Sequence, residues 1–217
     1  MRKEVFETGE YYHIYNRGVD HRIIFHSDKD RIRFIHGIYI LNNFRDIPPR
    51  FNLYTLEPRE LLTPMEPYVE ICAGSLMPNH YHLFVTPKRK NGISALFHKL
   101  GISHTTYFNK RYERTGRLFE STFKARHVDK PEYAQYITQY IHLNPLALLQ
   151  TKSGTDTSKQ LFQKLCGYKW SSLPDYLGGS SAFSHVLSPH FQNEISDLSP
   201  DEYRDITYEL FKESYQT

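Results

Sequence analysis

A short hairpin between residues 68 and 87 is the feature that most constrains the fold. Two apolar runs, Tyr68 to Met77 and Tyr81 to Pro87, are separated by the pair Pro78-Asn79. Proline and asparagine both favour turns, so the pattern predicts two antiparallel strands joined directly. The other elements must then pack around this pair of strands.

The second strand of this hairpin opens with two histidines. His80 and His82 flank Tyr81 in the run Pro-Asn-His-Tyr-His-Leu-Phe-Val. Residues i and i+2 of a strand point to the same face, so the two imidazoles lie roughly 7 Å apart at the backbone and point the same way. The pair could be two structural histidines on a half-buried sheet, or two thirds of a metal site.

The complementary groups lie on a predicted helix between Asp129 and Pro145. Asp129 is a plausible N-cap, and Pro145 should end the helix. The spacing i, i+3, i+7 and i+11 places four polar side chains on one stripe of that helix. In this stripe Tyr140 is a candidate nucleophile and Asn144, one turn later, a candidate oxygen ligand. The stripe consists of Tyr133, Tyr136, Tyr140 and Asn144. Amphipathic packing alone would also produce such a stripe.

The order of the elements predicts the fold. Strand, helix, strand, strand, helix, strand is the order of a ferredoxin-like split βαβ sandwich with an antiparallel sheet, in the α+β class. Five prolines between residues 42 and 67 indicate an irregular insertion, and the polar stretch from residue 151 to 159 a linker. The elements outside the hairpin are expected at Tyr11 to Arg17, Asp28 to Leu41, Gly92 to Arg114, Phe119 to Val128 and Pro200 to Ser214.

Taken together, these segments resemble a known family, the HUH single-tyrosine transposases, and within it the REP-associated tyrosine transposases. The His80 strand is similar to the HUH motif (His, hydrophobic residue, His), and the Tyr-Ile-His-Leu-Asn-Pro segment to the nucleophile helix. Further similar segments occur in the expected order, so the resemblance covers about residues 10 to 177. These segments are Tyr12 to Gly18 with Ile24-Phe25, Gly116 to Ala125, and Tyr168 to Ser172.

The resemblance implies a metal-dependent enzyme that nicks and joins single-stranded DNA. Mg²⁺ or Mn²⁺ held by His80, His82 and Asn144 would stabilise charge on a DNA phosphate. Tyr140 would attack the phosphorus, forming a 5′-phosphotyrosine and releasing a 3′-hydroxyl. The expected substrates are palindromic repeats folded as hairpins, processed by a monomer or a homodimer. Tyr136 is the alternative nucleophile.

Two other functions fit the same residues. The chain could be a catalytically silent protein that binds hairpin DNA or RNA, in which case metal should not affect binding. It could also be a metal-dependent phosphoesterase that uses water, with Tyr140 outside the reaction and no covalent adduct.

Charge is distributed unevenly along the chain. Residues 88 to 126 contain ten Lys or Arg against two Glu, which suits a polyphosphate partner. Residues 193 to 213 contain seven acids against two bases, a tail that could aid solubility or cover the basic region. The candidate DNA-binding residues are Arg17, Lys88, Arg89, Lys110, Arg111, Arg117, Lys124 and Arg126.

Three other side chains are interpreted as structural. His13 is expected to be a hydrogen-bonded core histidine, His142 to point away from the Tyr140 stripe, and Trp170 to pack in the core. The chain has two cysteines and no membrane-length apolar run, which favours a cytoplasmic protein without a membrane partner. A catalytic domain is expected over residues 1–149, followed by a linker and packed C-terminal extension over residues 150–217.

Overall fold

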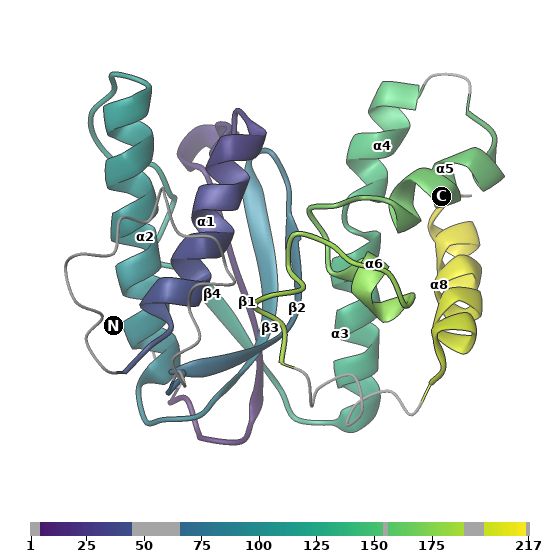
Figure 1. The fold of residues 1–217 in the computed structure, drawn as a ribbon, viewed down its shortest axis with the longest axis horizontal. Coiled ribbons are helices and arrows are strands. Elements are labelled where there is room, and N and C mark those ends of the chain that lie inside the picture. The colour runs from purple at the N-terminus through teal and green to yellow at the C-terminus, as the bar shows by residue number, and fades with distance from the viewer. Residues whose placement is uncertain (1–4, 45–65, 154–155, 189–197, 216–217) are drawn as a thin grey trace.

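A four-stranded antiparallel sheet forms the centre of the molecule, with helices on both faces (Figure 1). The computed structural model describes residues 5–44, 66–153, 156–188 and 198–215. The strand order β2-β3-β1-β4 is that of a ferredoxin-like sheet, so the predicted fold class is confirmed. The strands are β1 (Tyr11–Arg17), β2 (Val69–Leu76), β3 (His80–Pro87) and β4 (Lys124–Val128).

The helices divide between the two faces of the sheet. Two helices pack on one face of the sheet, and the remaining helices lie on the other side (Figure 1). The first face carries α1 (Asp28–Leu41) and α2 (Gly92–Arg111), and the turn after β1 contains the short η1 (Val19–His21). The other side carries α3 (Pro131–Leu143), α4 (Leu146–Ser153), α5 (Ser158–Cys166), α6 (Leu173–Tyr176) and α8 (Pro200–Tyr215).

Strand β3 separates two hydrophobic clusters. Tyr81, Leu83 and Val85 point into the cluster beneath α1 and α2. Phe84 points into the other cluster, against α3. Because side chains alternate across a strand, His80 and His82 share the Phe84 side and face α3. The predicted common direction of the two imidazoles follows from this alternation.

Several predicted boundaries are wrong. Strand β4 begins at Lys124 and not at Phe119, because the Asn16 amide donates hydrogen bonds to the carbonyls of Ser121 and Thr122 at 2.8 and 3.0 Å and takes the place of a strand ladder. Helix α2 ends at Arg111, and Glu113 beyond it has φ of 50°.

The boundaries of the tyrosine helix and of the expected linker also differ from prediction. Lys130, not Asp129, occupies the N-cap position of α3, with no side-chain cap hydrogen bond. The expected linker from 151 to 159 contains the end of α4 and the start of α5, where Thr157 and Gln160 form a capping box. Residues 45–65 of the predicted insertion lie outside the described residues.

The segment after α5 protects the exposed edge of the sheet. The backbone N–H of Leu76 donates to Trp170, and that of Ser172 donates to Gly74, at 2.8 and 2.9 Å. Trp170 is 6% exposed, so its predicted core role is confirmed. Edge strands that carry such partners are shielded from pairing with other chains.

Helix α3 is held from behind by α8 and the α6 region. The buried His142 ring joins the Tyr203 hydroxyl through Nδ1 and the Ser172 hydroxyl through Nε2, both at 2.7 Å. The Thr207 hydroxyl donates to Gln139 Oε1 at 2.8 Å. His142 therefore has the structural position that the sequence predicted.

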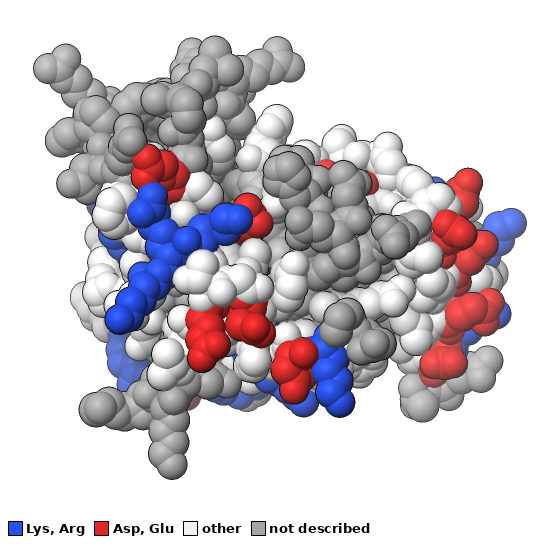
Figure 2. Space-filling model, turned by 90° about the horizontal axis from the view of Figure 1, so that it is seen from below, with Lys and Arg blue, Asp and Glu red and all other residues white. Residues whose placement is uncertain are grey.

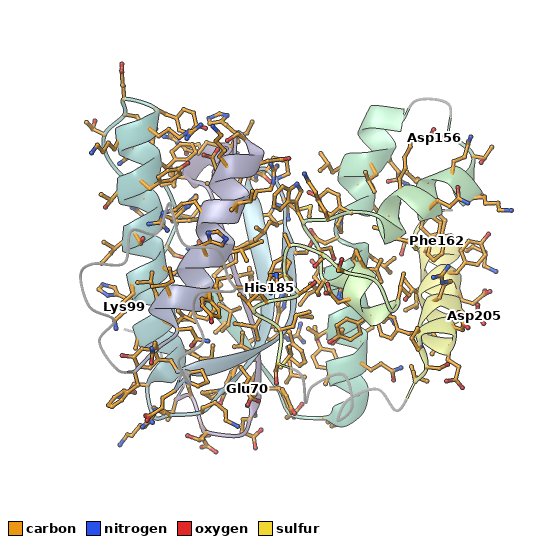
Figure 3. All side chains as sticks on the ribbon, in the orientation of Figure 1. Glu70, Lys99, Asp156, Phe162, His185 and Asp205 are labelled. Carbon is orange, nitrogen blue, oxygen red and sulfur yellow. The ribbon has the colours of Figure 1, made fainter. Side chains whose placement is uncertain are left out.

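Aromatic contacts join α5 to α8 in the same assembly. The centroid of the Phe162 ring lies 4.8 Å from that of the Tyr208 ring and 5.3 Å from that of the Phe211 ring. Asp205 also lies on α8 (Figure 3). The hydrogen bonds to α3 thus rest on the same hydrophobic cluster that packs α3 against the sheet.

Removing one of these hydrogen bonds should weaken the fold. We expect Thr207→Val to lower the free energy of unfolding by about 1–3 kcal/mol, because the buried Gln139 side chain and the Tyr203 carbonyl both lose the Thr207 hydroxyl as a partner. Urea denaturation would measure the change. Asp205→Ala, on the exposed side of the same helix, is the control and should change stability by less than about 0.5 kcal/mol. Equal losses in the two variants would contradict this role.

The buried His104 predicts a pH dependence of stability. Burial lowers its pKa from 6.5 to about 4, while the Ile24 carbonyl and Asp30 oppose the shift and Arg33 adds to it. At pH values between those two, the unfolded chain binds a proton that the folded chain does not, so stability should fall as the pH falls through this range.

His104→Gln should flatten that dependence by up to about 1.4 kcal/mol per pH unit. Urea titrations at several pH values would measure it, with His185→Gln as the surface control. An unchanged slope in His104→Gln would refute the assignment.

Candidate active site

The two histidines of β3 lie side by side on the sheet face that α3 covers. Their ring centroids are 5.1 Å apart, with the rings nearly perpendicular. His82 is buried and His80 is half-buried, so the His82 ring lies deeper in the site than the His80 ring.

Helix α3 brings its polar stripe onto these histidines. Asn144 Oδ1 lies 3.0 Å from His80 Nε2. The Tyr140 ring lies edge-on to the His82 ring, with centroids 5.7 Å apart, and is 41% exposed. The four residues proposed from the sequence therefore meet at one place within a single chain.

Tyr136 occupies a different position. It is 55% exposed and stacks on Tyr133 at 5.7 Å, one turn before Tyr140. Among the described residues, no ring contact joins Tyr136 to a histidine of β3. The geometry therefore favours Tyr140 over Tyr136 as the residue facing the histidine pair.

His80 has hydrogen-bond acceptors at both ring nitrogens. Asn79 Oδ1 lies 2.7 Å from its Nδ1, while Asn144 Oδ1 lies close to its Nε2. A neutral imidazole carries one N–H and can donate to only one of them. If Nδ1–H donates to Asn79, the lone pair of Nε2 faces the lone pairs of Asn144 Oδ1.

A third histidine joins the site from β1. His13 is 5% exposed, and its Nε2 lies 2.8 Å from His82 Nδ1. It is a hydrogen-bonded core histidine, as predicted, but sequence reasoning did not identify its partner. The alternation of Tyr11, His13 and Tyr15 could have placed it on a face, although the pairing of β1 with β3 was needed to place it beside His82.

Burial keeps all three imidazoles neutral near physiological pH. Desolvation lowers the pKa of His82 to about 2, with smaller effects of His13 and His80. Desolvation, followed by the charge of Arg126, lowers the pKa of His13 to about 4. Desolvation also lowers the pKa of His80, which Asn144 partly opposes. Neutral imidazole is the form that binds metals.

A cavity of about 390 Å³ opens beside the two histidines. Among the candidate DNA-binding residues, Arg17 and Lys124 line it. The Arg17 Nε donates to Glu120 at 2.7 Å, and Lys124 Nζ lies 3.4 Å from the same carboxylate. The hydrogen bond from Arg17 is the main cause that lowers the pKa of Glu120. One carboxylate thus holds two cations at the cavity. The lining residues are Tyr15, Asn16, Arg17, His21, Asn79, His80, His82 and Lys124.

The other predicted DNA-binding residues do not line this cavity. Lys88 and Arg89 pair with Glu70 and Glu66, and Arg111 lies 3.5 Å from the buried Asp30. The remaining three are the exposed Lys110, Arg117, which donates to the Glu120 carbonyl, and Arg126, which lies 5.1 Å from the centroid of the Tyr133 ring.

The described part of the acidic C-terminal segment, α8, lies on the other side of α3 from the sheet (Figure 1). Figure 2 shows acidic side chains at the right-hand end of the molecule, where Figure 1 places α8. No described residue of α8 lines the cavity with Arg17 and Lys124. Leu210, Glu213 and Ser214 of α8 instead line a second cavity, of about 330 Å³, whose lining also includes Tyr140.

The donor set of the site is unusual for a protein metal site. The described part of the chain contains no cluster of three His, Cys, Asp or Glu side chains suited to a metal ion. The set at β3 and α3 has two imidazoles and an amide oxygen.

In the described residues, no helix is long and apolar enough to span a membrane.

Comparison with known proteins agrees with these features. Residues 65–144 match the model of the family described as Transposase IS200 like, and this segment contains His80, His82, Tyr140 and Asn144. No curated protein sequence gave a significant match.

A solved structure has a similar fold. It is that of a REP-associated tyrosine transposase bound to a REP hairpin, with 11% sequence identity and a TM-score of 0.53. The similarity covers 92% of this chain and 95% of that one. These findings show that residues 65–144 are similar to the IS200-like transposase family and that the chain has a fold similar to that of a REP-associated tyrosine transposase.

Proposed function

We propose that this protein is a metal-dependent transesterase that nicks and rejoins single-stranded DNA beside hairpin-forming palindromic repeats. The observation that carries the proposal is the meeting of Tyr140 with His80, His82 and Asn144 on one face of the sheet. A phenol, two neutral imidazoles and an amide oxygen are the groups that a metal-assisted attack on phosphorus requires.

The donor set fits a divalent ion such as Mg²⁺ or Mn²⁺. His80 Nε2 and Asn144 Oδ1 lie 3.0 Å apart, and when the Nδ1–H of His80 donates to Asn79 these two atoms both present lone pairs. An imidazole nitrogen and an amide oxygen would then both be available to hold such an ion. When bound, the ion would stabilise negative charge on a phosphate oxygen.

Tyr140 is the proposed nucleophile. Its hydroxyl oxygen forms a bond to phosphorus while the bond from phosphorus to the 3′-oxygen breaks. The DNA 5′-phosphate is then held as a phosphotyrosine, and the 3′-oxygen leaves as a hydroxyl with a proton that balances the one released by the Tyr140 hydroxyl. Attack by another 3′-hydroxyl reverses these steps and restores Tyr140. The exposed fraction of Tyr140 leaves its ring accessible to a strand.

Arg17 and Lys124 supply positive charge for the DNA backbone. Both line the cavity beside His80 and His82, and both pair with Glu120. A phosphate entering this cavity would compete with the Glu120 carboxylate for them. The pair is therefore pre-oriented for phosphate but partly neutralised when DNA is absent.

The geometry favours a site assembled within one chain. Tyr140 lies against His82 of its own chain, so no second copy is required to complete the set. The substrate class is proposed from the similar solved structure, which holds a REP hairpin.

Covalent trapping tests the proposed chemistry. Labelled hairpin DNA with a single-stranded flank is incubated with Mn²⁺ or Mg²⁺ and resolved on a denaturing gel. The wild type should give a metal-dependent protein–DNA adduct. Tyr140→Phe should abolish it, and His80→Ala should reduce it by at least about 100-fold, because charge stabilisation is lost.

Tyr136→Phe is the matched control, because it removes a neighbouring hydroxyl on the same helix and should leave the adduct unchanged. Cleavage without an adduct that survives Tyr140→Phe would identify a water-using phosphoesterase. Metal-independent binding with neither cleavage nor adduct would identify a silent hairpin-binding protein. Either result overturns the proposal.

The role of Glu120 gives a second test. Glu120→Gln should strengthen single-stranded DNA binding and steepen its salt dependence, since Arg17 and Lys124 become available to phosphates; each new contact adds about 0.7 to the slope of log K against log salt. Fluorescence anisotropy over a range of KCl concentrations would measure both quantities.

Glu209→Gln is the control for loss of a negative charge, because Glu209 pairs with Lys212 on α8. If both variants change DNA binding equally, the effect is one of net charge and not of the Arg17–Glu120–Lys124 arrangement.

A further inference from the structure

His13 is the buried histidine of the site to which the proposed chemistry assigns no task. It lies on β1 directly opposite Phe84 of β3, and its ring reaches the neighbouring His82. The two rings are nearly parallel, with centroids 5.0 Å apart and an interplanar angle of 22°. The 2.8 Å distance between His13 Nε2 and His82 Nδ1 is that of a hydrogen bond between ring nitrogens.

This hydrogen bond determines which nitrogen of His82 is available as a ligand. Two neutral imidazoles that share one hydrogen bond must supply one N–H and one lone pair. If His82 Nδ1–H donates to His13 Nε2, the lone pair of His82 lies on Nε2. Nε2 has no hydrogen-bond partner among the described residues, and His82 lines the cavity that also contains His80.

His80 shows the same arrangement. Its Nδ1 lies 2.7 Å from Asn79 Oδ1, the shorter of its two contacts with amide oxygens, and when Nδ1–H donates there the lone pair lies on Nε2. Each imidazole of the pair thus has a partner at Nδ1, an amide oxygen for His80 and a second imidazole for His82. Histidines that bind metals commonly donate their other N–H in this way, which orients the ring and selects the tautomer.

His13 also contacts the proposed nucleophile. Its ring lies edge-on to the Tyr140 ring, with centroids 5.9 Å apart and an interplanar angle of 74°. The Tyr140 ring therefore rests on both His13 and His82. A change at position 13 would reach a proposed ligand and the proposed nucleophile together.

We infer that His13 is a positioning residue that holds His82 in the tautomer with its Nε2 lone pair turned to the cavity and supports the Tyr140 ring. This inference rests on the proposed function, because it assigns His82 the role of a metal ligand. A purely apolar role explains the position less well: a buried polar ring is costly unless it is hydrogen-bonded, and the bond it makes is to His82.

Two substitutions separate the hydrogen bond from packing. His13→Gln keeps an acceptor oxygen near the position of Nε2, whereas His13→Phe keeps a flat ring but removes the acceptor. Long-range ¹H–¹⁵N NMR of the metal-free protein reports the tautomer of His82. The wild type and His13→Gln should carry the proton on Nδ1. In His13→Phe, His82 should lose this preference, because no acceptor faces Nδ1.

Calorimetric titration with Mn²⁺ gives the second readout. His13→Phe should weaken Mn²⁺ binding by about 10–100-fold, and His13→Gln should restore most of the affinity. His104→Gln, which alters a buried histidine hydrogen-bonded to Ile24 away from the site, controls for a general loss of stability.

The outcomes distinguish this inference from the proposed function. Protonation of His82 at Nε2 in the wild type, or equal Mn²⁺ affinity in wild type and His13→Phe, would overturn the role of His13. A wild type that binds no Mn²⁺ but carries the His82 proton on Nδ1 would refute the proposed metal dependence, while leaving the hydrogen-bond assignment of His13 supported.

Discussion

The attachment of α3 to the rest of the molecule is the interaction on which the candidate site depends. His142 is enclosed between the Tyr203 and Ser172 hydroxyls, on the side of the helix away from Tyr140. Each of these hydrogen bonds is modest by itself, but loss of both would leave the buried imidazole and the Tyr203 hydroxyl unpaired, because only Ser172 keeps another partner, the Gly74 N–H. The helix is therefore restrained in rotation as well as in position. That restraint directs Tyr140 and Asn144 toward the sheet and makes the C-terminal extension part of the site without contributing a ligand.

The same enclosure sets the chemistry of the histidines. Desolvation lowers the pKa of His82 and of His13, so both rings are neutral when the helix covers them. Two neutral rings can share one hydrogen bond, whereas two protonated rings whose nitrogens lie 2.8 Å apart would repel each other. Burial of this sheet face thus disfavours protonation of the imidazoles and leaves each of them a nitrogen lone pair that could bind a cation. Packing and ligand chemistry are two consequences of one arrangement.

Much of this arrangement could be predicted from the sequence, because local patterns carry it. The i, i+2 spacing of His80 and His82 sets their common face, and the i, i+4 spacing of Tyr140 and Asn144 sets theirs. The element order gave the ferredoxin-like sheet for the same reason. The partner of His13 could not be predicted, since it depends on the register between β1 and β3 across 69 residues. The predicted start of β4 was wrong for a related reason. Phe119 and Phe123 follow the alternation of a strand, but the side-chain amide of Asn16 replaces the backbone hydrogen bonds of a strand ladder there. The linker expected after residue 150 was polar enough to resemble a loop, although Thr157 and Gln160 form a helix-starting capping box.

Restraint of α3 also bears on the direction of the proposed reaction. A nicking and joining enzyme must present its nucleophile before cleavage and hold the phosphotyrosine in place until a 3′-hydroxyl returns. A tyrosine on a freely rotating helix would lose that alignment once the leaving strand departed. Here the Tyr140 ring rests edge-on against His13 and His82, and its helix is tied to α8 through Gln139 and Thr207. The alignment therefore does not depend on the DNA, and the forward and reverse attacks would use the same geometry. Because these contacts all lie within one chain, the proposed cleavage and rejoining would require no residue from a second copy.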